Sequence, residues 1–223
     1  AGDDDVEVPA WRIASKALRP LPKTWTNEAG EAVTLSEEQR VRRRELDLLT
    51  RPAARDMVRT RAAVVRSIRE NFFRRDYLEL ETPMLQVIHG GAAARPFITH
   101  MNAFDMDLYL RIATEIYLKR AVVGGVDRVF EINRNFRNEG ADSSHSPEFT
   151  ALEAYEAYSD YNGMAELTRN LVQQAARDAF GLPEGGEVVR LGDGTEYDLS
   201  GEWDKIDLYT SVSEALGEEI TVE

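Results

Sequence analysis

Two strand-like stretches joined by a polar loop restrict the fold more than any other feature of this sequence. The first strand is expected within Arg128–Ile132 and Arg134–Asn138, and the returning strand within Glu148–Tyr158. The loop Gly140–Pro147 makes them a long-looped hairpin. Because strands here are joined by hairpins and loops more often than by helical crossovers, the pattern favours an antiparallel α+β sheet over a doubly wound one.

Several helices are expected to flank this sheet. Ser36 is a suitable N-cap for a charged helix through Leu49, and Pro52 suits the first turn of the next helix. That next helix has one apolar stripe, made by Met57, Val58, Val64, Val65, Ile68, Phe72 and Phe73. Two more helices are predicted over Glu115–Val123 and Tyr161–Phe180. The expected fold class is therefore α+β, with an antiparallel sheet flanked by helices.

Shorter strands complete the prediction. They are expected at Tyr77–Leu80, at Leu108–Arg111, in a hairpin of Val188–Leu191 with Glu196–Leu199, and just before a last helix near Ser213. Asp5–Ile13 alternates weakly and also reads as a strand. One strand cannot stand alone, so it is expected to belong to a sheet whose other strands lie outside this sequence.

Composition excludes several classes of function. There is no cysteine, and the three histidines are scattered, so we expect no disulfide and no metal site within this chain. No apolar run reaches the roughly 18 residues that a membrane span needs, and the acidic start does not resemble a signal peptide, which indicates a soluble cytoplasmic protein. No glycine-rich phosphate loop is present, so side chains must hold any nucleotide.

Charge is distributed unevenly along the chain. The net charge of −13 argues against unspecific binding of polyanions. Yet Ser36–Arg75 contains 12 Arg against 6 Asp and Glu, while Ala176–Glu223 contains 3 Lys and Arg against 13 Asp and Glu. The Arg-rich stretch is either a solvated helix face or a surface that contacts RNA or a second subunit.

The returning strand of the hairpin presents polar and aromatic groups together. Because side chains alternate between the faces of a strand, Phe149, Glu153 and Tyr155 point the same way. A carboxylate in that setting is costly to bury unless it is paired. Glu153 therefore either forms an ion pair inside the sheet, for which Arg137 is a candidate, or receives a cationic ligand.

The first strand adds the opposite charge. By the same alternation Asn135, Arg137 and Glu139 share a face, and the planar fork of Arg137 suits phosphate or carboxylate. His145, near the end of the loop, is a further donor that could reach phosphate. A salt-bridged hairpin would also explain Arg137, but the concentration of such groups on one hairpin favours a site.

Two features before the hairpin are also candidates. Glu115 begins a helix, where a carboxylate is either favoured by the helix dipole or available to bind an ammonium group. Gly90 and Gly91 precede three alanines, a composition that either marks a turn or leaves backbone carbonyls accessible to an amine.

These residues match the pattern of a known family. Phe130–Tyr155, with the sequence FEINRNFRNEGADSSHSPEFTALEAY, resembles motif two of class II lysyl-tRNA synthetases. Arg59–Pro83 resembles motif one, which forms the dimer interface in that family, and His89–Arg120 resembles the lysine-specific segment between the two motifs. The resemblance runs from about Asp5 to the end of the sequence.

The resemblance implies a role for each matched residue at the nucleotide. Arg137, the expected catalytic residue, would hold both the lysine carboxylate and the α-phosphate of ATP. Glu139 would contact the adenosine, Phe149 would stack on adenine, and His145 would contact the polyphosphate.

At the amino acid, the resemblance assigns the two ammonium groups of lysine. Gly91 and Glu115 would hold the α-ammonium, and Glu153 with Tyr155 would receive the side-chain ammonium. The implied reaction is the attack of the lysine carboxylate on the α-phosphorus of ATP, followed by transfer of the lysyl group to tRNA(Lys). Mg²⁺ is the implied metal, with ligands expected beyond residue 223.

The resemblance also predicts how the chain is organised. Residues 1–22 would be the last strand and linker of an N-terminal OB-fold that binds the anticodon, and residues 23–223 the first part of the catalytic domain. We therefore expect a fragment that is inactive or impaired by itself, from a homodimeric enzyme. The alternatives are an enzyme that attaches lysine to a protein such as an elongation factor, and a non-catalytic dimerising fragment.

The sequence departs from the family pattern in the motif-two loop and before the helix at Glu115. Many members have Arg-His-Asn-Pro-Glu-Phe where this sequence has Ser-His-Ser-Pro-Glu-Phe, so Ser144 replaces a phosphate-facing Arg and Ser146 replaces Asn. The family's Ala-Pro-Glu is Ala-Thr-Glu here, with Thr114 in place of proline.

Overall fold

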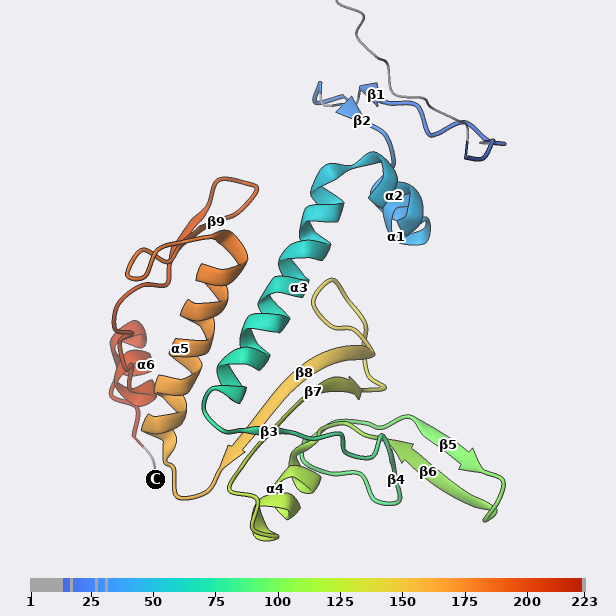
Figure 1. Cartoon of the computed structure of the whole chain (residues 1–223). Coiled ribbons are helices and arrows are strands. Elements are labelled where there is room, and N and C mark those ends of the chain that lie inside the picture. The colour runs from blue at the N-terminus through green and yellow to red at the C-terminus, as the bar shows by residue number, and fades with distance from the viewer. Residues whose placement is uncertain (1–13, 17, 27, 31, 222–223) are drawn as a thin grey trace, which may run out of the picture. The chain divides into compact units, whose positions relative to one another are not determined.

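The structure, a computed structural model, describes residues 14–16, 18–26, 28–30 and 32–221 (Figure 1). The strand predicted at Asp5–Ile13, and with it the expected remnant of an OB-fold, lies outside the described residues. The chain divides into two units, Ala1–Thr60 and Arg61–Glu223.

The first unit contains a short hairpin and two charged helices. Strands β1 (Trp25–Thr26) and β2 (Ala32–Val33) pair antiparallel. Helix α1 (Glu37–Arg42) has Ser36 as its N-cap, as predicted, in a capping box with Gln39.

The single helix predicted through Leu49 is wrong, because the chain leaves the helical conformation at Arg43, where φ is −124° and ψ is 60°. A second helix, α2 (Arg44–Thr50), follows. Its Asp47 is 1% exposed and accepts from Arg51 at 2.7 Å. The sequence did not predict this break, because no glycine or proline marks it. The burial and pairing of Asp47 close to the break arise only when the chain folds.

Arginines of the first unit are largely matched by nearby carboxylates. Ion pairs join Arg42 to Glu38, Arg43 to Glu45 and Arg59 to Asp56, and all six side chains are more than half exposed. Such pairs contribute little to stability, and they are typical of a solvated helix face.

Helix α3 (Pro52–Phe73) begins at Pro52, as predicted, and its end contributes to the core of the second unit. Phe72 is fully buried and stacks on Phe130 with 4.4 Å between ring centres. Leu167 and Leu171 complete this cluster. The apolar stripe read from the sequence therefore faces the sheet at this end of the helix.

The main sheet has the order β3-β7-β8. Strand β3 (Leu78–Glu79) pairs parallel with β7 (Arg128–Phe136), and β7 pairs antiparallel with β8 (Glu148–Glu156). The α+β class is confirmed, and β3 is the exception to antiparallel pairing. A long connection separates β3 from β7, which permits a parallel pair.

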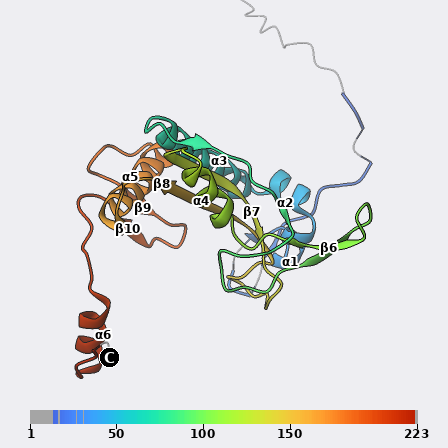
Figure 2. The same cartoon turned by 90° about the horizontal axis from the view of Figure 1, so that it is seen from below.

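A second sheet has the order β4-β6-β5, with all pairs antiparallel. Its strands are β4 (Leu85–Gln86), β5 (Ile98–Met101) and β6 (Met106–Leu110), of which the sequence predicted only the last. Helix α4 (Glu115–Val123) follows with the predicted bounds. Figures 1 and 2 show α4 on the other side of β7 and β8 from α3.

The two faces of β7 and β8 differ in chemistry. Phe130 faces the core under α3 and α5, with Ile132 and Ala154 packed against that core. On the opposite face Glu131 lies across from Glu153. Strand alternation thus separates an apolar packing face from a polar face, and the polar face carries the candidate site.

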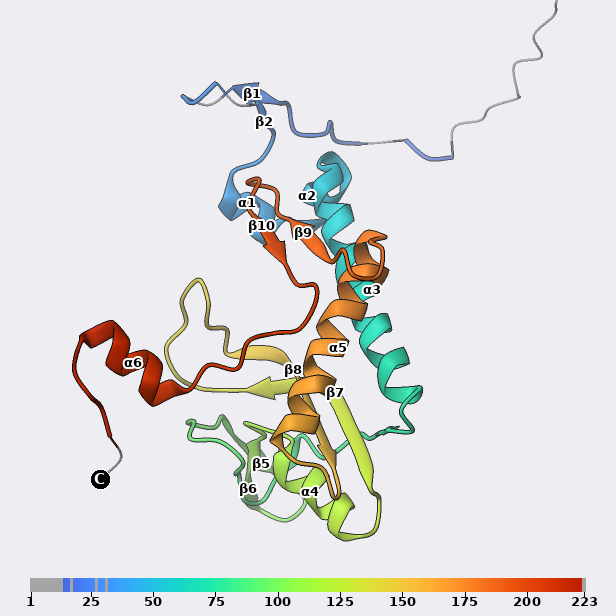
Figure 3. The same cartoon turned by 90° about the vertical axis from the view of Figure 1, so that its left-hand side faces the viewer.

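The C-terminal part of the second unit follows β8 (Figure 3). Helix α5 (Tyr161–Phe180) has the predicted bounds, is capped by Asp160 and ends at Gly181 with a φ of 67°. The predicted hairpin is formed by β9 (Val188–Arg190) and β10 (Glu196–Asp198). Helix α6 (Leu208–Leu216) comes next, and among the described residues the short strand expected before it is missing.

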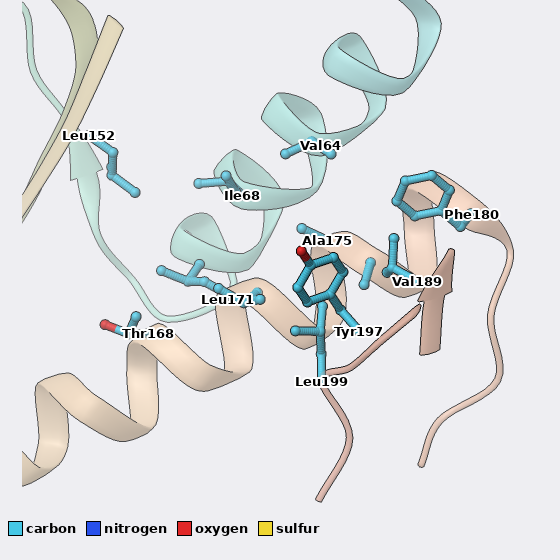
Figure 4. Close-up of a pocket in the computed structure, with 12 residues that line it drawn as sticks. Val64, Ile68, Leu152, Thr168, Leu171, Ala175, Phe180, Val189, Tyr197 and Leu199 are labelled. Atoms are coloured by element: carbon cyan, nitrogen blue, oxygen red, sulfur yellow. The ribbon is translucent and has the colours of Figure 1, made fainter. Parts of the chain in front are cut away.

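An apolar pocket of about 600 Å³ lies between α3, α5, β8 and the β9–β10 hairpin. Figure 4 shows Ile68, Leu171 and Tyr197 around it.

No helix among residues 14–221 that the structure describes combines the length and the hydropathy that crossing a membrane would require.

Candidate functional site

The hairpin loop forms a small cavity at the end of the polar sheet face. Its volume is about 310 Å³, and it is lined by Arg137, Glu139, Gly140, Ser144, His145, Ser146 and Phe149. All four residues expected at the nucleotide, Arg137, Glu139, His145 and Phe149, are therefore brought together.

Arg137 lies over the ring of Phe149, with its guanidinium carbon 5.1 Å from the ring centre. Its backbone amide donates to the carbonyl of Pro147 at 2.9 Å, which continues the hairpin one step beyond β7. Its Nε is buried and has no hydrogen-bond partner among the described residues. A buried donor without a partner is costly to a folded protein.

Glu139 lies beyond the strand rather than on it, because β7 ends at Phe136. The expectation that Glu139 continues the strand face is corrected accordingly. Glu139 Oε1 accepts from the backbone amide of Arg95 at 2.9 Å, and this bond joins the loop after β7 to the segment before β5.

His145 is held by a residue that sequence reasoning missed. Asp142 Oδ1 accepts from the backbone amides of Ser144 at 2.7 Å and His145 at 2.8 Å, and the His145 Nδ1 lies 2.9 Å away. These bonds, the backbone bond from Ser144 first, lower the pKa of Asp142 to about 2. The Asp-Ser-Ser-His spacing suits an Asx turn, a signal that the sequence did contain.

Glu153 and Tyr155 form the second part of the site. Glu153 Oε2 accepts from the Tyr155 hydroxyl at 2.9 Å, and Oε1 accepts from the backbone amide of Thr114 at 3.0 Å. Burial, and then the bond to Glu153, raise the pKa of Tyr155 well above its usual range. Among the described residues Glu153 therefore pairs with Thr114 and Tyr155, and the alternative ion pair with Arg137 is wrong.

Gly91 and Glu115 are packed against one another. The φ of Gly91 is +89°, and a Cβ there would lie 3.0 Å from Glu115 Cβ and 3.1 Å from Ala113 Cβ. The loop at Gly91, where accessible backbone carbonyls were expected, therefore packs against the start of α4.

A lysine of the chain already contacts this group of side chains. Glu115 Oε1 lies 2.6 Å from Lys119 Nζ, and that ammonium is 5.7 Å from the centre of the Tyr155 ring. The surroundings of Glu115 and Tyr155 thus suit a primary ammonium group.

A buried ion pair that the sequence did not predict lies next to these groups, because its Glu131 is across from Glu153 in the sheet. Arg111 is fully buried, Glu131 is 1% exposed, and 2.7 Å separates Arg111 Nη1 from Glu131 Oε1. Neither residue type predicts burial, because arginine and glutamate are mostly exposed.

No group of three or more His, Cys, Asp or Glu side chains suited to a metal ion occurs in the part of the chain that the structure describes. No chemical step is therefore assigned to a metal on these residues.

The two-faced hairpin and the groups on its polar face are those of one family. The chain belongs to the class II tRNA synthetases: the sequence model described as "tRNA synthetases class II (D, K and N)" matches residues 36–219.

Named relatives narrow the likeness. The chain is 59% identical over 222 residues to the lysine–tRNA ligase of Kineococcus radiotolerans, covering 100% of this chain and 42% of that protein. It is 58% identical over 220 residues to the lysine–tRNA ligase of Mycolicibacterium gilvum, and the match covers 99% of this chain and 42% of that protein. It is 50% identical over 221 residues to the lysylphosphatidylglycerol biosynthesis bifunctional protein LysX of Gordonia bronchialis. That match covers 99% of this chain and 19% of that protein. The chain thus spans about two fifths of the ligases that it matches.

Proposed function

We propose that the protein to which this chain contributes activates L-lysine with ATP and transfers the lysyl group to tRNA(Lys). The observation that carries this proposal is the placement of two carboxylates: Glu153 accepts from the Thr114 amide and the Tyr155 hydroxyl, and Glu115 begins α4 directly after Thr114. Two carboxylates match the two ammonium groups of lysine. The relatives named lysine–tRNA ligase support the same substrate.

The lysine carboxylate requires a cation, and Arg137 supplies it. Its Nε has no protein partner among the described residues, and its planar fork suits both a carboxylate and a phosphate. Held by Arg137, the carboxylate would attack the α-phosphorus of ATP. The bond from that phosphorus to the bridging oxygen breaks, and pyrophosphate leaves. Orientation and charge stabilisation account for this step without a general base.

The cavity of the hairpin loop would receive the nucleotide. Phe149 offers an aromatic face for adenine, and Glu139 offers a carboxylate for the adenosine. His145, fixed by Asp142, is the donor assigned to the polyphosphate. Ser144 contributes only a hydroxyl where many family members have an arginine.

The remaining parts of the proposal concern partners and location. A homodimer would form through Arg59–Pro83, the region in which Phe73 and Leu78 are 51% and 56% exposed. The cytoplasm is the compartment in which such an enzyme would meet tRNA and ATP.

Exchange of labelled pyrophosphate into ATP tests the activation step. The complete protein should catalyse exchange that depends on added lysine, and it should charge tRNA(Lys) with lysine. Arg137→Ala should remove the exchange, while Arg134→Ala, on β7 and 49% exposed at its side chain, should leave it nearly unchanged. Exchange that depends on another amino acid, or none with lysine, would sink the proposal.

A second candidate follows from the likeness to LysX. The name of that relative places it in the biosynthesis of lysylphosphatidylglycerol. If the complete protein has that role, it will form lysylated phosphatidylglycerol when supplied with lysine, ATP, tRNA and vesicles of phosphatidylglycerol. Charged tRNA without lysylated lipid would favour the ligase.

A further inference from the structure

The buried pair Arg111–Glu131 lies where the elements that carry the proposed ligands meet, and Glu131 is the register partner of Glu153 across β7 and β8. Arg111 has the largest fully buried side chain among the described residues. A buried ion pair is weak support for stability, because desolvation offsets much of the attraction. Its presence therefore calls for a role beyond stability.

The pair joins three segments of the chain. Arg111 Nε donates to the carbonyl of Arg134 on β7 at 2.8 Å, and its Nη1 donates to the carbonyl of Thr82, which follows β3, at 3.0 Å. Glu131 Oε2 accepts from the Thr82 hydroxyl at 2.6 Å. The backbone amide of Phe136 donates to the carbonyl of Arg111 at 3.0 Å. One side chain thus fixes the end of β6 to β7, and so joins the two sheets.

Each end of this junction leads directly to one end of the proposed lysine site. Along the chain from Arg111, Thr114 donates its backbone amide to Glu153, and Glu115 begins α4. Along β7 from Arg134, the chain passes Phe136 and reaches Arg137. The junction therefore fixes Thr114, whose amide holds the Glu153 carboxylate, and Glu115 relative to Arg137.

The bonds of Arg111 depend on the geometry of its guanidinium group as well as on its charge. The fork of Arg111 is used in two directions, toward Glu131 and toward the Arg134 carbonyl. A lysine ammonium would satisfy Glu131 but could not reproduce both directions with fixed geometry. Replacing arginine by lysine therefore separates the charge of the pair from its geometry.

We propose that Arg111 and Glu131 are positioning residues that set the length of the amino-acid site, and so select lysine over a shorter diamino acid. The proposal rests on the proposed function. One methylene in a binding pocket is worth about 10-fold to 200-fold in discrimination, so a site of fixed length would reject ornithine by a factor in this range.

The test compares lysine and ornithine in pyrophosphate exchange by the complete protein. Arg111→Lys should lower the ratio of kcat/KM for lysine over ornithine by about tenfold, while the KM for ATP changes less than about twofold. Arg128→Lys is the matched control. It alters another Arg–Glu pair of β7, at 2.7 Å from Glu156, where the arginine side chain is 44% exposed. The control should leave the ratio unchanged.

Three results would overturn the inference. The first is Arg111→Lys with an unchanged lysine-to-ornithine ratio and only a lower melting temperature. The second is an equal loss toward both amino acids and ATP, which indicates general damage. The third is a variant that fails to fold while Glu131→Gln, which keeps one of the two acceptor oxygens, folds and retains the full ratio. If the wild-type protein shows no exchange with lysine, the proposed function itself fails.

Discussion

Gly91 is the position at which a single methyl group should most clearly separate folding from lysine recognition. The change is Gly91→Ala. At a φ of +89°, alanine costs about 1–2 kcal/mol in backbone strain, whatever space surrounds it. In addition the new Cβ would lie 3.0 Å from Glu115 Cβ, closer than carbon atoms pack, so Glu115 must move.

Gly125→Ala is the matched control for that strain. Its φ is +95°, and no atom lies within 4 Å of the position of a new Cβ. Both variants should therefore lose about 1–2 kcal/mol of unfolding free energy from backbone strain. Only Gly91→Ala displaces a proposed ligand of the α-ammonium. A displaced charged contact of about 1.5–3 kcal/mol corresponds to a loss of roughly 10-fold to 100-fold in kcat/KM for lysine.

The assay is lysine-dependent pyrophosphate exchange by the complete protein, together with thermal melting of each variant. Gly125→Ala should melt earlier than wild type but keep the wild-type KM for lysine within about twofold, since its strain lies away from the ligands. Equal effects of the two variants on lysine would refute the reasoning, because strain alone would then account for Gly91. A wild-type response to lysine in Gly91→Ala would refute it as well.

The other predictions concern three further contacts. Tyr155→Phe removes the hydroxyl that donates to Glu153, and it should raise the KM for lysine about tenfold in pyrophosphate exchange without changing that for ATP. Asp142→Asn loosens His145 and should raise the KM for ATP a few-fold. The pKa of Asp142 is lowered in the folded state from 3.8 to about 2, so its stabilising effect is present above the unfolded pKa and is lost as pH falls from about 4 to 2. Acid unfolding followed by circular dichroism should show a smaller pH dependence over that window in the Asn variant. Ser36→Ala removes the capping box of α1 and should reduce helix stability by about 0.5–2 kcal/mol, measured by denaturant titration, with lysine kinetics unchanged.

Local signals predicted the bounds of two helices correctly. The bounds of α4 and α5 agree with the sequence prediction, because Gly124 and Gly181 end them and Asp160 caps the second. Alternation along β8 also predicted that Glu153 and Tyr155 share a face, and their hydrogen bond confirms it. These features depend on residues within a few positions of each other, so a single sequence contains them.

Contacts between distant segments were not predictable in the same way. The parallel pairing of β3 with β7, and the burial of Arg111 against Glu131, depend on how three segments meet. The contact of Thr114 with Glu153 is of the same kind, since it joins a loop to a strand 39 residues further along. Residue types alone indicated exposed arginines and left an ion pair of Glu153 with Arg137 as one alternative. In the folded chain Arg111 is buried against Glu131, and Glu153 accepts from Thr114 and Tyr155.

The resemblance to a family supplied the identity of the site residues, and the structure supplied their contacts. In the structure the residues assigned to ATP line one cavity, and Gly91 packs against Glu115. Which ligand each group holds stays a prediction, and the variants above are designed to test these assignments one by one.

The central claim is that Glu153, with Tyr155, recognises the side-chain ammonium of lysine. The most direct test measures kcat/KM in pyrophosphate exchange for lysine and for norleucine, which ends in a methyl group, with the complete wild-type protein and with Glu153→Gln. Loss of the charge should lower kcat/KM for lysine by about 10-fold to 100-fold and leave that for norleucine within about twofold. An unchanged value for lysine, or an equal loss for both amino acids, would contradict the claim.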